Sequence, residues 1–115
     1  MSTKSTIEEC QTAITSLLPE HYPMIGEVAG RLGMSVRTFQ RRLGQFGLSY
    51  SQLVENTRRE RACRLLRKGN LKLSVVAGSI GYTDPSSFTR AFRRWKGVPP
   101  SVYQRSCSTP SADKD

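Results

Sequence analysis

Apolar residues recur along most of this chain at the three- and four-residue spacing of helices that bury one face. Glycine, proline and small polar residues separate the apolar stretches. The pattern predicts an all-α fold of seven helices, over about residues 5–18, 23–32, 36–46, 50–68, 74–80, 85–96 and 99–105.

Residues that cap helices precede several of these segments. Ser5-Thr6-Ile7-Glu8 and Ser49-Tyr50-Ser51-Gln52 both have the form of a capping box. Ser35 is placed to cap the third segment. Asp84 is placed to cap the sixth, with Pro85 at its first helical position. The apolar stripes of the third and sixth segments, which include Phe39 and Phe88, are expected to form core.

The chain also contains an internal repeat. Val28-Ala29-Gly30-Arg31-Leu32-Gly33 returns as Val76-Ala77-Gly78-Ser79-Ile80-Gly81, and each copy is followed by a polar turn and an aromatic, basic helix. Two copies of helix, glycine turn and basic helix indicate two helix-turn-helix units. We predict a first helix-turn-helix subdomain at residues 5–48, a linker helix at 49–69, a second helix-turn-helix subdomain at 70–105 and a disordered tail at 106–115.

Positive charge is concentrated in the middle of the sequence. Residues 31–105 contain 16 lysines and arginines but only three acidic residues, Glu55, Glu60 and Asp84. Such a surface attracts polyanions, and nucleic acid is the first candidate. The linker helix would be about 28 Å long, near the roughly 34 Å of one turn of B-DNA. Both basic helices could therefore enter successive major grooves on one face of a duplex.

The polar faces of the two basic helices carry side chains that can read DNA. Arginine donates two bonds to guanine, glutamine pairs with adenine, and serine can bond to either partner. The predicted base contacts are Arg37, Gln40, Arg41, Ser86, Ser87 and Arg90. The predicted phosphate contacts are Arg42, Arg93, Arg94 and Lys96. Because the two faces differ, one chain should recognise an asymmetric site. The alternative is that these charges only solvate the helix surfaces.

Other function classes have less support. No catalytic arrangement can be assembled around His21, the only histidine, so no enzyme activity and no cofactor is predicted. Cys10, Cys63 and Cys107 lack metal-ligand spacing, so no metal site or disulfide framework is predicted, and Cys63 is expected in the core. No stretch approaches the roughly 18 apolar residues of a membrane span, and we expect an intracellular protein. A protein-interaction or membrane-surface module built on the basic linker helix remains an alternative.

The most specific motif runs from Gly81 to Tyr103 and reads GYTDPSSFTRAFRRWKGVPPSVY. It resembles the signature of AraC/XylS-type transcriptional regulators. The first copy, Leu32 to Leu43, is also similar to that family, and the likeness covers about residues 5–105. The resemblance implies a seven-helix, two-lobed DNA-binding domain that recruits RNA polymerase at bacterial promoters, in the cytoplasm at the nucleoid. It maps the family's DNA-reading residues onto the same six predicted base contacts.

The resemblance also bears on what surrounds this domain. Most members of the family join it to a sensor domain, so the chain is expected to be either an excised C-terminal domain or a stand-alone regulator. The domain alone should be monomeric, and a full-length protein could dimerise through the sensor domain. Some alkyl-transfer DNA-repair proteins carry the same type of domain, but they would need a cysteine cluster. The sequence departs from the family at Gln104, which separates Tyr103 from Arg105 where Tyr-Arg is usual.

Overall fold

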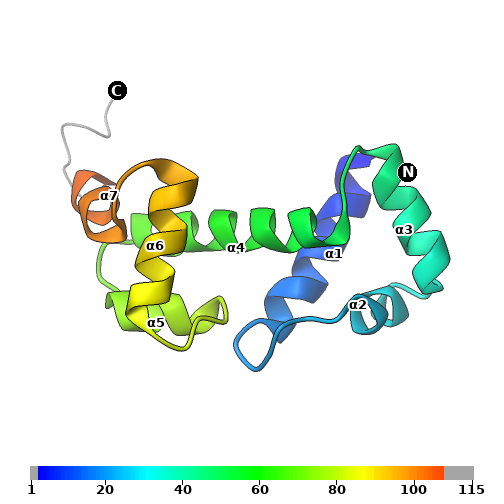
Figure 1. Cartoon of the computed structure of the whole chain (residues 1–115), viewed down its shortest axis with the longest axis horizontal. Coiled ribbons are helices and arrows are strands. Elements are labelled where there is room, and N and C mark those ends of the chain that lie inside the picture. Colours follow the sequence, from blue (N-terminus) through cyan, green and yellow to red (C-terminus); the bar gives the residue numbers. More distant parts are fainter. Residues whose placement is uncertain (1–2, 108–115) are drawn as a thin grey trace. The chain divides into compact units, whose positions relative to one another are not determined.

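A computed structural model of the chain describes residues 3–107, with side chains from Ile7 onward (Figure 1). The described residues form helices and no strands, and the all-α fold class is confirmed. The helices are α1 (Thr3–Leu17), α2 (Ile25–Arg31), α3 (Val36–Gln45), α4 (Tyr50–Arg67), α5 (Leu73–Ser79), α6 (Pro85–Lys96) and α7 (Pro100–Cys107).

The chain divides into two compact units, and the division falls between Arg58 and Arg59, inside α4. The first unit contains α1, α2, α3 and the start of α4, and the second contains the rest of α4 with α5, α6 and α7. In the first unit α2 packs against α1 and α3, and in the second unit α6 packs against α5 and α7. The boundary lies within residues 49–69, the segment predicted as a linker helix.

Each unit has its own apolar core. In the first unit the largest fully buried side chains are Ile14, Leu18, Val28, Phe39, Leu43, Leu53 and Val54. In the second unit they are Leu66, Val76, Ile80, Phe88 and Phe92. The Phe92 ring lies 5.3 Å from the Tyr103 ring and 5.9 Å from the Phe88 ring, measured between centroids. The predicted core role of the aromatic stripes is therefore confirmed at Phe39, Phe88 and Phe92, whereas Phe46 and Trp95 are half-buried. The burial of Cys63 is also confirmed.

The turn inside each helix-turn-helix unit has the same backbone geometry. Gly33 and Gly81 both have positive φ, 74° and 94°, where a side chain would be strained. The residues that follow them donate equivalent hydrogen bonds: the Met34 N–H to the Ala29 carbonyl and the Tyr82 N–H to the Ala77 carbonyl, each at 3.0 Å. The sequence repeat is thus a repeat of structure.

The two units also share a bond at the start of the helix that precedes the glycine turn, α2 in the first unit and α5 in the second. The Tyr50 hydroxyl donates to the Pro23 carbonyl at 2.8 Å, and the Gln104 side-chain amide donates to the Leu71 carbonyl at 2.9 Å. Each carbonyl belongs to the residue just before the N-cap of α2 or α5. In both units, therefore, the helix after the basic helix (α4 after α3, α7 after α6) is tied back to the loop before α2 or α5. We refer to these two bonds as the carbonyl tethers.

Several helix ends differ from the sequence prediction by up to two residues, and α2, for example, begins at Ile25 rather than near Pro23. The predicted capping box at Ser5 is wrong, because α1 begins at Thr3 and Ser5 lies inside it. Neither Thr3 nor Lys4 is a glycine or proline, so neither prevents the helix from starting before Ser5. At the other end, α7 runs to Cys107, two residues into the predicted tail. Residues 108–115 of that tail lie outside the described part of the chain.

Candidate nucleic-acid interface

Both basic helices begin at the predicted capping residues. The Ser35 hydroxyl accepts the Thr38 N–H at 3.1 Å at the start of α3. The Asp84 carboxylate accepts the Ser87 N–H at 2.7 Å at the start of α6, and Pro85 is the first helical residue. Side-chain acceptors at this position satisfy N–H groups that have no partner within the helix. The starts of both predicted reading helices are thus fixed by local chemistry.

The outer face of α3 presents the three predicted base contacts of the first unit. Phe39 and Leu43 point into the core, and Arg37, Gln40 and Arg41 are all exposed. Arg37 and Arg41 are one helical turn apart, so they share a face. Arg42 is also exposed, but it directly follows Arg41 and is turned by about 100° from it. The structure therefore brings Arg37, Gln40 and Arg41 together and places Arg42 beside them.

The outer face of α6 is arranged in the same way. Ser86, Arg90, Arg93 and Arg94 are exposed, and Ser87 is half-buried. The Ser87 hydroxyl donates to the Asp84 carboxylate at 3.1 Å, and Arg90 Nη2 donates to the Ser87 hydroxyl at 3.4 Å. The pKa of Asp84 is lowered, first by the Ser87 N–H, then by the Ser87 hydroxyl, with a smaller contribution from the charge of Arg90. Asp84 is therefore ionised at neutral pH.

The last predicted phosphate contact, Lys96, lies toward α7. Its Nζ atom is 5.7 Å from the centroid of the Tyr103 ring, a cation–π distance. Arg67 Nη1 donates to the Tyr103 hydroxyl at 3.2 Å, so two cations from two helices surround one tyrosine. Sequence reasoning did not connect Arg67 with Tyr103, because the two residues are 36 positions apart and no local spacing links them.

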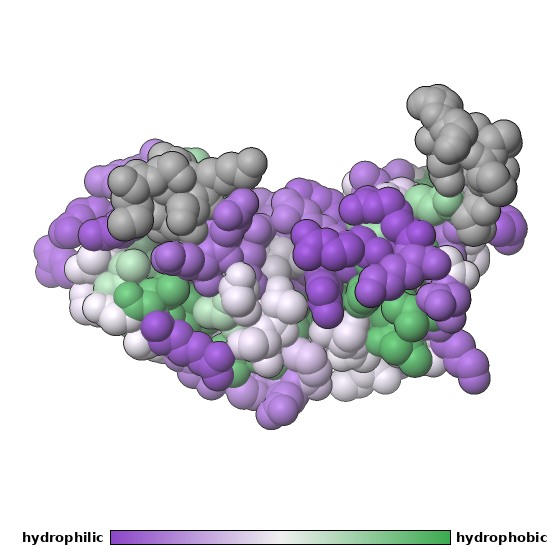
Figure 2. All heavy atoms as spheres, turned by 180° about the vertical axis from the view of Figure 1, so that it is seen from behind, coloured by the Kyte–Doolittle hydropathy of each residue, from purple (hydrophilic) through white to green (hydrophobic). Residues whose placement is uncertain are grey.

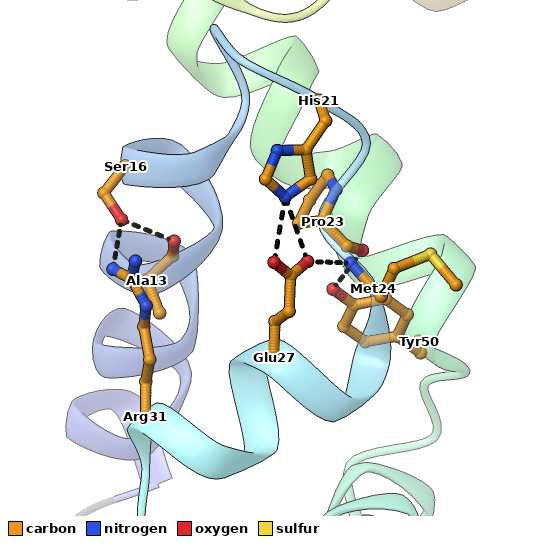
Figure 3. Close-up of polar contacts among 8 residues, drawn as sticks. All are labelled: Ala13, Ser16, His21, Pro23, Met24, Glu27, Arg31 and Tyr50. Atoms are coloured by element: carbon orange, nitrogen blue, oxygen red, sulfur yellow. Dashed lines mark hydrogen bonds and ion pairs between the residues drawn. The ribbon is translucent and has the colours of Figure 1, made fainter.

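The only histidine has a structural contact in the loop before α2 (Figure 3). His21 Nε2 lies 2.9 Å and 3.1 Å from the two carboxylate oxygens of Glu27, which also accepts the Met24 N–H at 3.0 Å. The pKa of Glu27 is lowered, mainly by the Met24 N–H and next by its bond to His21. Figure 3 also shows the carbonyl tether from Tyr50 to Pro23 beside this group. These contacts define the start of α2.

A second polar contact joins α1 to the end of α2. Arg31 Nη1 donates to the Ser16 hydroxyl at 2.8 Å, and that hydroxyl donates to the Ala13 carbonyl at 2.8 Å (Figure 3). Arg31 is therefore engaged within the first unit, although it belongs to the same basic stretch of sequence as the predicted DNA contacts.

The surface is dominated by hydrophilic residues, with smaller apolar patches between them on the face shown in Figure 2. The larger apolar side chains that are exposed are Tyr22, Met24, Val36, Val75 and Val102. Within residues 3–107, no helix is long and apolar enough to cross a membrane. The same residues contain no group of three or more His, Cys, Asp or Glu side chains placed to hold a metal ion.

Residues 28–106 match the family model of a helix-turn-helix domain, which covers more than half of the chain. An uncharacterised HTH-type transcriptional regulator of Mycobacterium tuberculosis is 43% identical over 84 residues, which are 73% of this chain and 24% of that protein. The chain spans about a quarter of the length of the curated relatives it matches.

Solved structures share the fold. A transcriptional regulator with an AraC-type DNA-binding domain from Chromobacterium violaceum superposes with a TM-score of 0.77 at 18% identity, covering 94% of this chain and 96% of that one. The DNA-binding domain of AdpA, a global transcriptional factor solved in complex with a target DNA, superposes with a TM-score of 0.69 at 27% identity. That alignment covers 93% of this chain and 96% of the AdpA chain.

Proposed function

Because this chain belongs to the AraC-type helix-turn-helix family of transcriptional regulators, we propose that it binds double-stranded DNA with a sequence preference. The observation that carries the proposal is the repeated unit. Each copy caps a basic helix at its start, buries one face of it, and exposes arginines on the opposite face. The core needs only the buried sides of these helices, so the repeated arginine faces support a role in binding a polyanion.

The proposed base contacts are the outer-face residues in the first turns of α3 and α6: Arg37, Gln40, Arg41, Ser86, Ser87 and Arg90. The N-terminal part of a recognition helix enters the major groove most deeply, where each base pair has its own pattern of donors and acceptors. The proposed phosphate contacts are Arg42, Arg93, Arg94 and Lys96. Their position beside or after the reading residues suits contacts with the backbone of the duplex.

We further propose that α3 and α6 enter successive major grooves of one asymmetric promoter site. The two outer faces differ in chemistry, because α3 offers arginine and glutamine whereas α6 offers serine and arginine. Different faces select different base pairs, so the site need not be palindromic. A single copy of this domain is then sufficient to contact both parts of the site.

The role in the cell is proposed at the level of the family. Bound at a bacterial promoter in the nucleoid, the domain would recruit RNA polymerase. In a longer protein, a sensor domain would control that activity and could provide a dimer contact. The related chains are about three times as long as this one, which leaves room for such a domain in proteins of this type.

Selection from a random duplex library tests this proposal. The purified chain would be incubated with the library at near-physiological salt, and the bound duplexes would be sequenced. Enrichment of two short blocks about one helical turn apart is the expected result. A single enriched block would contradict the two-groove arrangement, and the absence of any enrichment would contradict sequence-specific binding by this chain.

A further inference from the structure

The two basic helices share a pair of polar residues at their starts. In the first unit, Ser35 accepts the Thr38 N–H, and its hydroxyl donates to the Thr38 hydroxyl at 3.1 Å. In the second unit, Asp84 accepts the Ser87 N–H, and the Ser87 hydroxyl donates to its carboxylate at 3.1 Å. Each pair therefore joins a capping side chain to a hydroxyl three residues later.

In the second unit this pair extends to a predicted base contact. Arg90 Nη2 donates to the Ser87 hydroxyl at 3.4 Å. A serine hydroxyl has one proton and two lone pairs. The Ser87 hydroxyl donates its proton to Asp84 and accepts from Arg90 with a lone pair. The three side chains therefore form a chain of hydrogen bonds that runs from Arg90 through Ser87 to Asp84. The guanidinium has five N–H donors, and one bond to Ser87 leaves enough of them to contact a guanine.

The first unit lacks this extension. Arg41 occupies the position equivalent to Arg90, three residues after Thr38, and it is exposed. Among the described residues no hydrogen bond joins Arg41 to Thr38, and the capping residue Ser35 carries no charge. Of the two capping side chains, only Asp84 is acidic. It is also the one that is linked to an arginine, Arg90, through the Ser87 hydroxyl.

We propose that Asp84 and Ser87 are positioning residues that hold Arg90 in a reading conformation before DNA arrives. The inference rests on the proposed function, because it requires Arg90 to contact a base. Ordering a long side chain in advance removes part of the entropy lost on binding. For Ser87 this role replaces the base contact proposed above, because its hydroxyl proton is directed to Asp84 and one of its lone pairs accepts from Arg90. The α6 face is then the more stringent reader, and the α3 face, with Arg41 unrestrained by a charge, is the more tolerant one.

Two substitutions separate this role from helix capping. Asp84→Ser introduces the capping residue found at the equivalent position of the first unit, and serine and aspartate cap helices about equally well. The melting temperature should therefore change little, while the carboxylate that accepts from the Ser87 hydroxyl is lost. Ser87→Ala removes the bridge and leaves both Asp84 and Arg90 in place. Each variant should lose about two- to tenfold in discrimination at one base pair.

That base pair is identified by comparing library selection by the wild-type chain with selection by Arg90→Ala. Asp84→Ser and Ser87→Ala should reduce discrimination at the same base pair. When either is combined with Arg90→Ala, it should cause little further loss of discrimination, because the effects of residues that act through one another are not additive. Thr38→Ala, the matched control in the first unit, should leave discrimination at this base pair unchanged.

Three results would overturn the inference. Full discrimination in both Asp84→Ser and Ser87→Ala would show that Arg90 needs no positioning, while the proposed function would stand. Relaxation of a different base pair by Ser87→Ala would show that Ser87 reads a base directly. Full discrimination in Arg90→Ala would remove the assigned role of Arg90 and this inference together, whereas a wild-type chain that selects no site would contradict the proposed function itself.

Discussion

Arg93 lies on the same exposed face of α6 as Arg90, one turn closer to its C-terminus, and the two arginines should contribute differently to binding. Arg93→Ala should weaken binding to specific and random duplexes alike and reduce the slope of log affinity against log salt by about one, as expected for one lost phosphate contact. Arg90→Ala should instead remove about 1–3 kcal/mol of discrimination at a single base pair. Affinities measured at several salt concentrations, on both duplexes, distinguish the two. An unchanged slope in Arg93→Ala would assign that side chain to the solvated surface.

Gln104 should stabilise the second unit through its carbonyl tether. Gln104→Ala removes the donor of the 2.9 Å bond and leaves the half-buried Leu71 carbonyl without it, which should cost about 1–2 kcal/mol in the free energy of unfolding. Ser106→Ala is the control on the same helix, because its hydroxyl bonds only to the exposed Tyr103 carbonyl one turn earlier. Urea unfolding measures both, and an equal effect of the two substitutions would show that the tether contributes nothing.

The residues that sequence reasoning identified correctly are those whose role is local. Ser35 and Asp84 were predictable as caps, because the capping bond joins positions three apart. Gln104 was interpreted only as a departure from a family pattern, since its partner lies 33 residues away. The contact of Arg67 with Tyr103 was missed for the same reason. Such bonds depend on how helices pack, and no spacing along the chain encodes them.

At the scale of the element, two glycines near the end of α3 have opposite requirements. Gly44 has helical geometry, and a Cβ there would meet nothing within 4 Å, so Gly44→Ala should stabilise the first unit by up to about 1 kcal/mol. Gly47 has a φ of 75°, and Gly47→Ala should destabilise it by about 1–2 kcal/mol because an L side chain is strained there. Thermal unfolding measures both. Destabilisation by Gly44→Ala would mean that a side chain at position 44 is not tolerated in the folded chain.

The start of α2 should depend on pH through Glu27. The pKa of its carboxyl is lowered below the ordinary 4.5 by the Met24 N–H and then by His21, so the ionised form is favoured in the folded chain. The stability it contributes is therefore complete above that ordinary value and is lost as the pH falls through the lower pKa of the folded chain. Denaturant unfolding of the wild-type chain and Glu27→Gln should give a difference that shrinks below pH 4.5. A difference independent of pH would show that Glu27 acts without its charge.

For the whole molecule, the fold could be predicted from the sequence because the chain contains two copies of the helix-turn-helix unit. The glycine turns at Gly33 and Gly81 and the apolar stripes that begin at Phe39 and Phe88 repeat at nearly constant offsets, and the structure repeats them in turn geometry and burial. The position of the division inside α4 was not accessible. A helix that gives Leu53 and Val54 to one core and Leu66 to another shows no single apolar stripe along its length, so periodicity alone does not locate the change.

The carbonyl tethers bear on the history of such repeats. Pro23 and Leu71 occupy matching positions, but a tyrosine hydroxyl reaches one carbonyl and a glutamine amide reaches the other. When the two copies of the repeat are aligned, Tyr50 and Gln104 are one helical turn apart. A phenol and an amide have in common only that each can donate a hydrogen bond. If both units descend from one ancestor, the hydrogen bond to this carbonyl has been kept while the residue that donates it has changed in type and position. Similarity between the copies, counted residue by residue, then understates how closely they remain related.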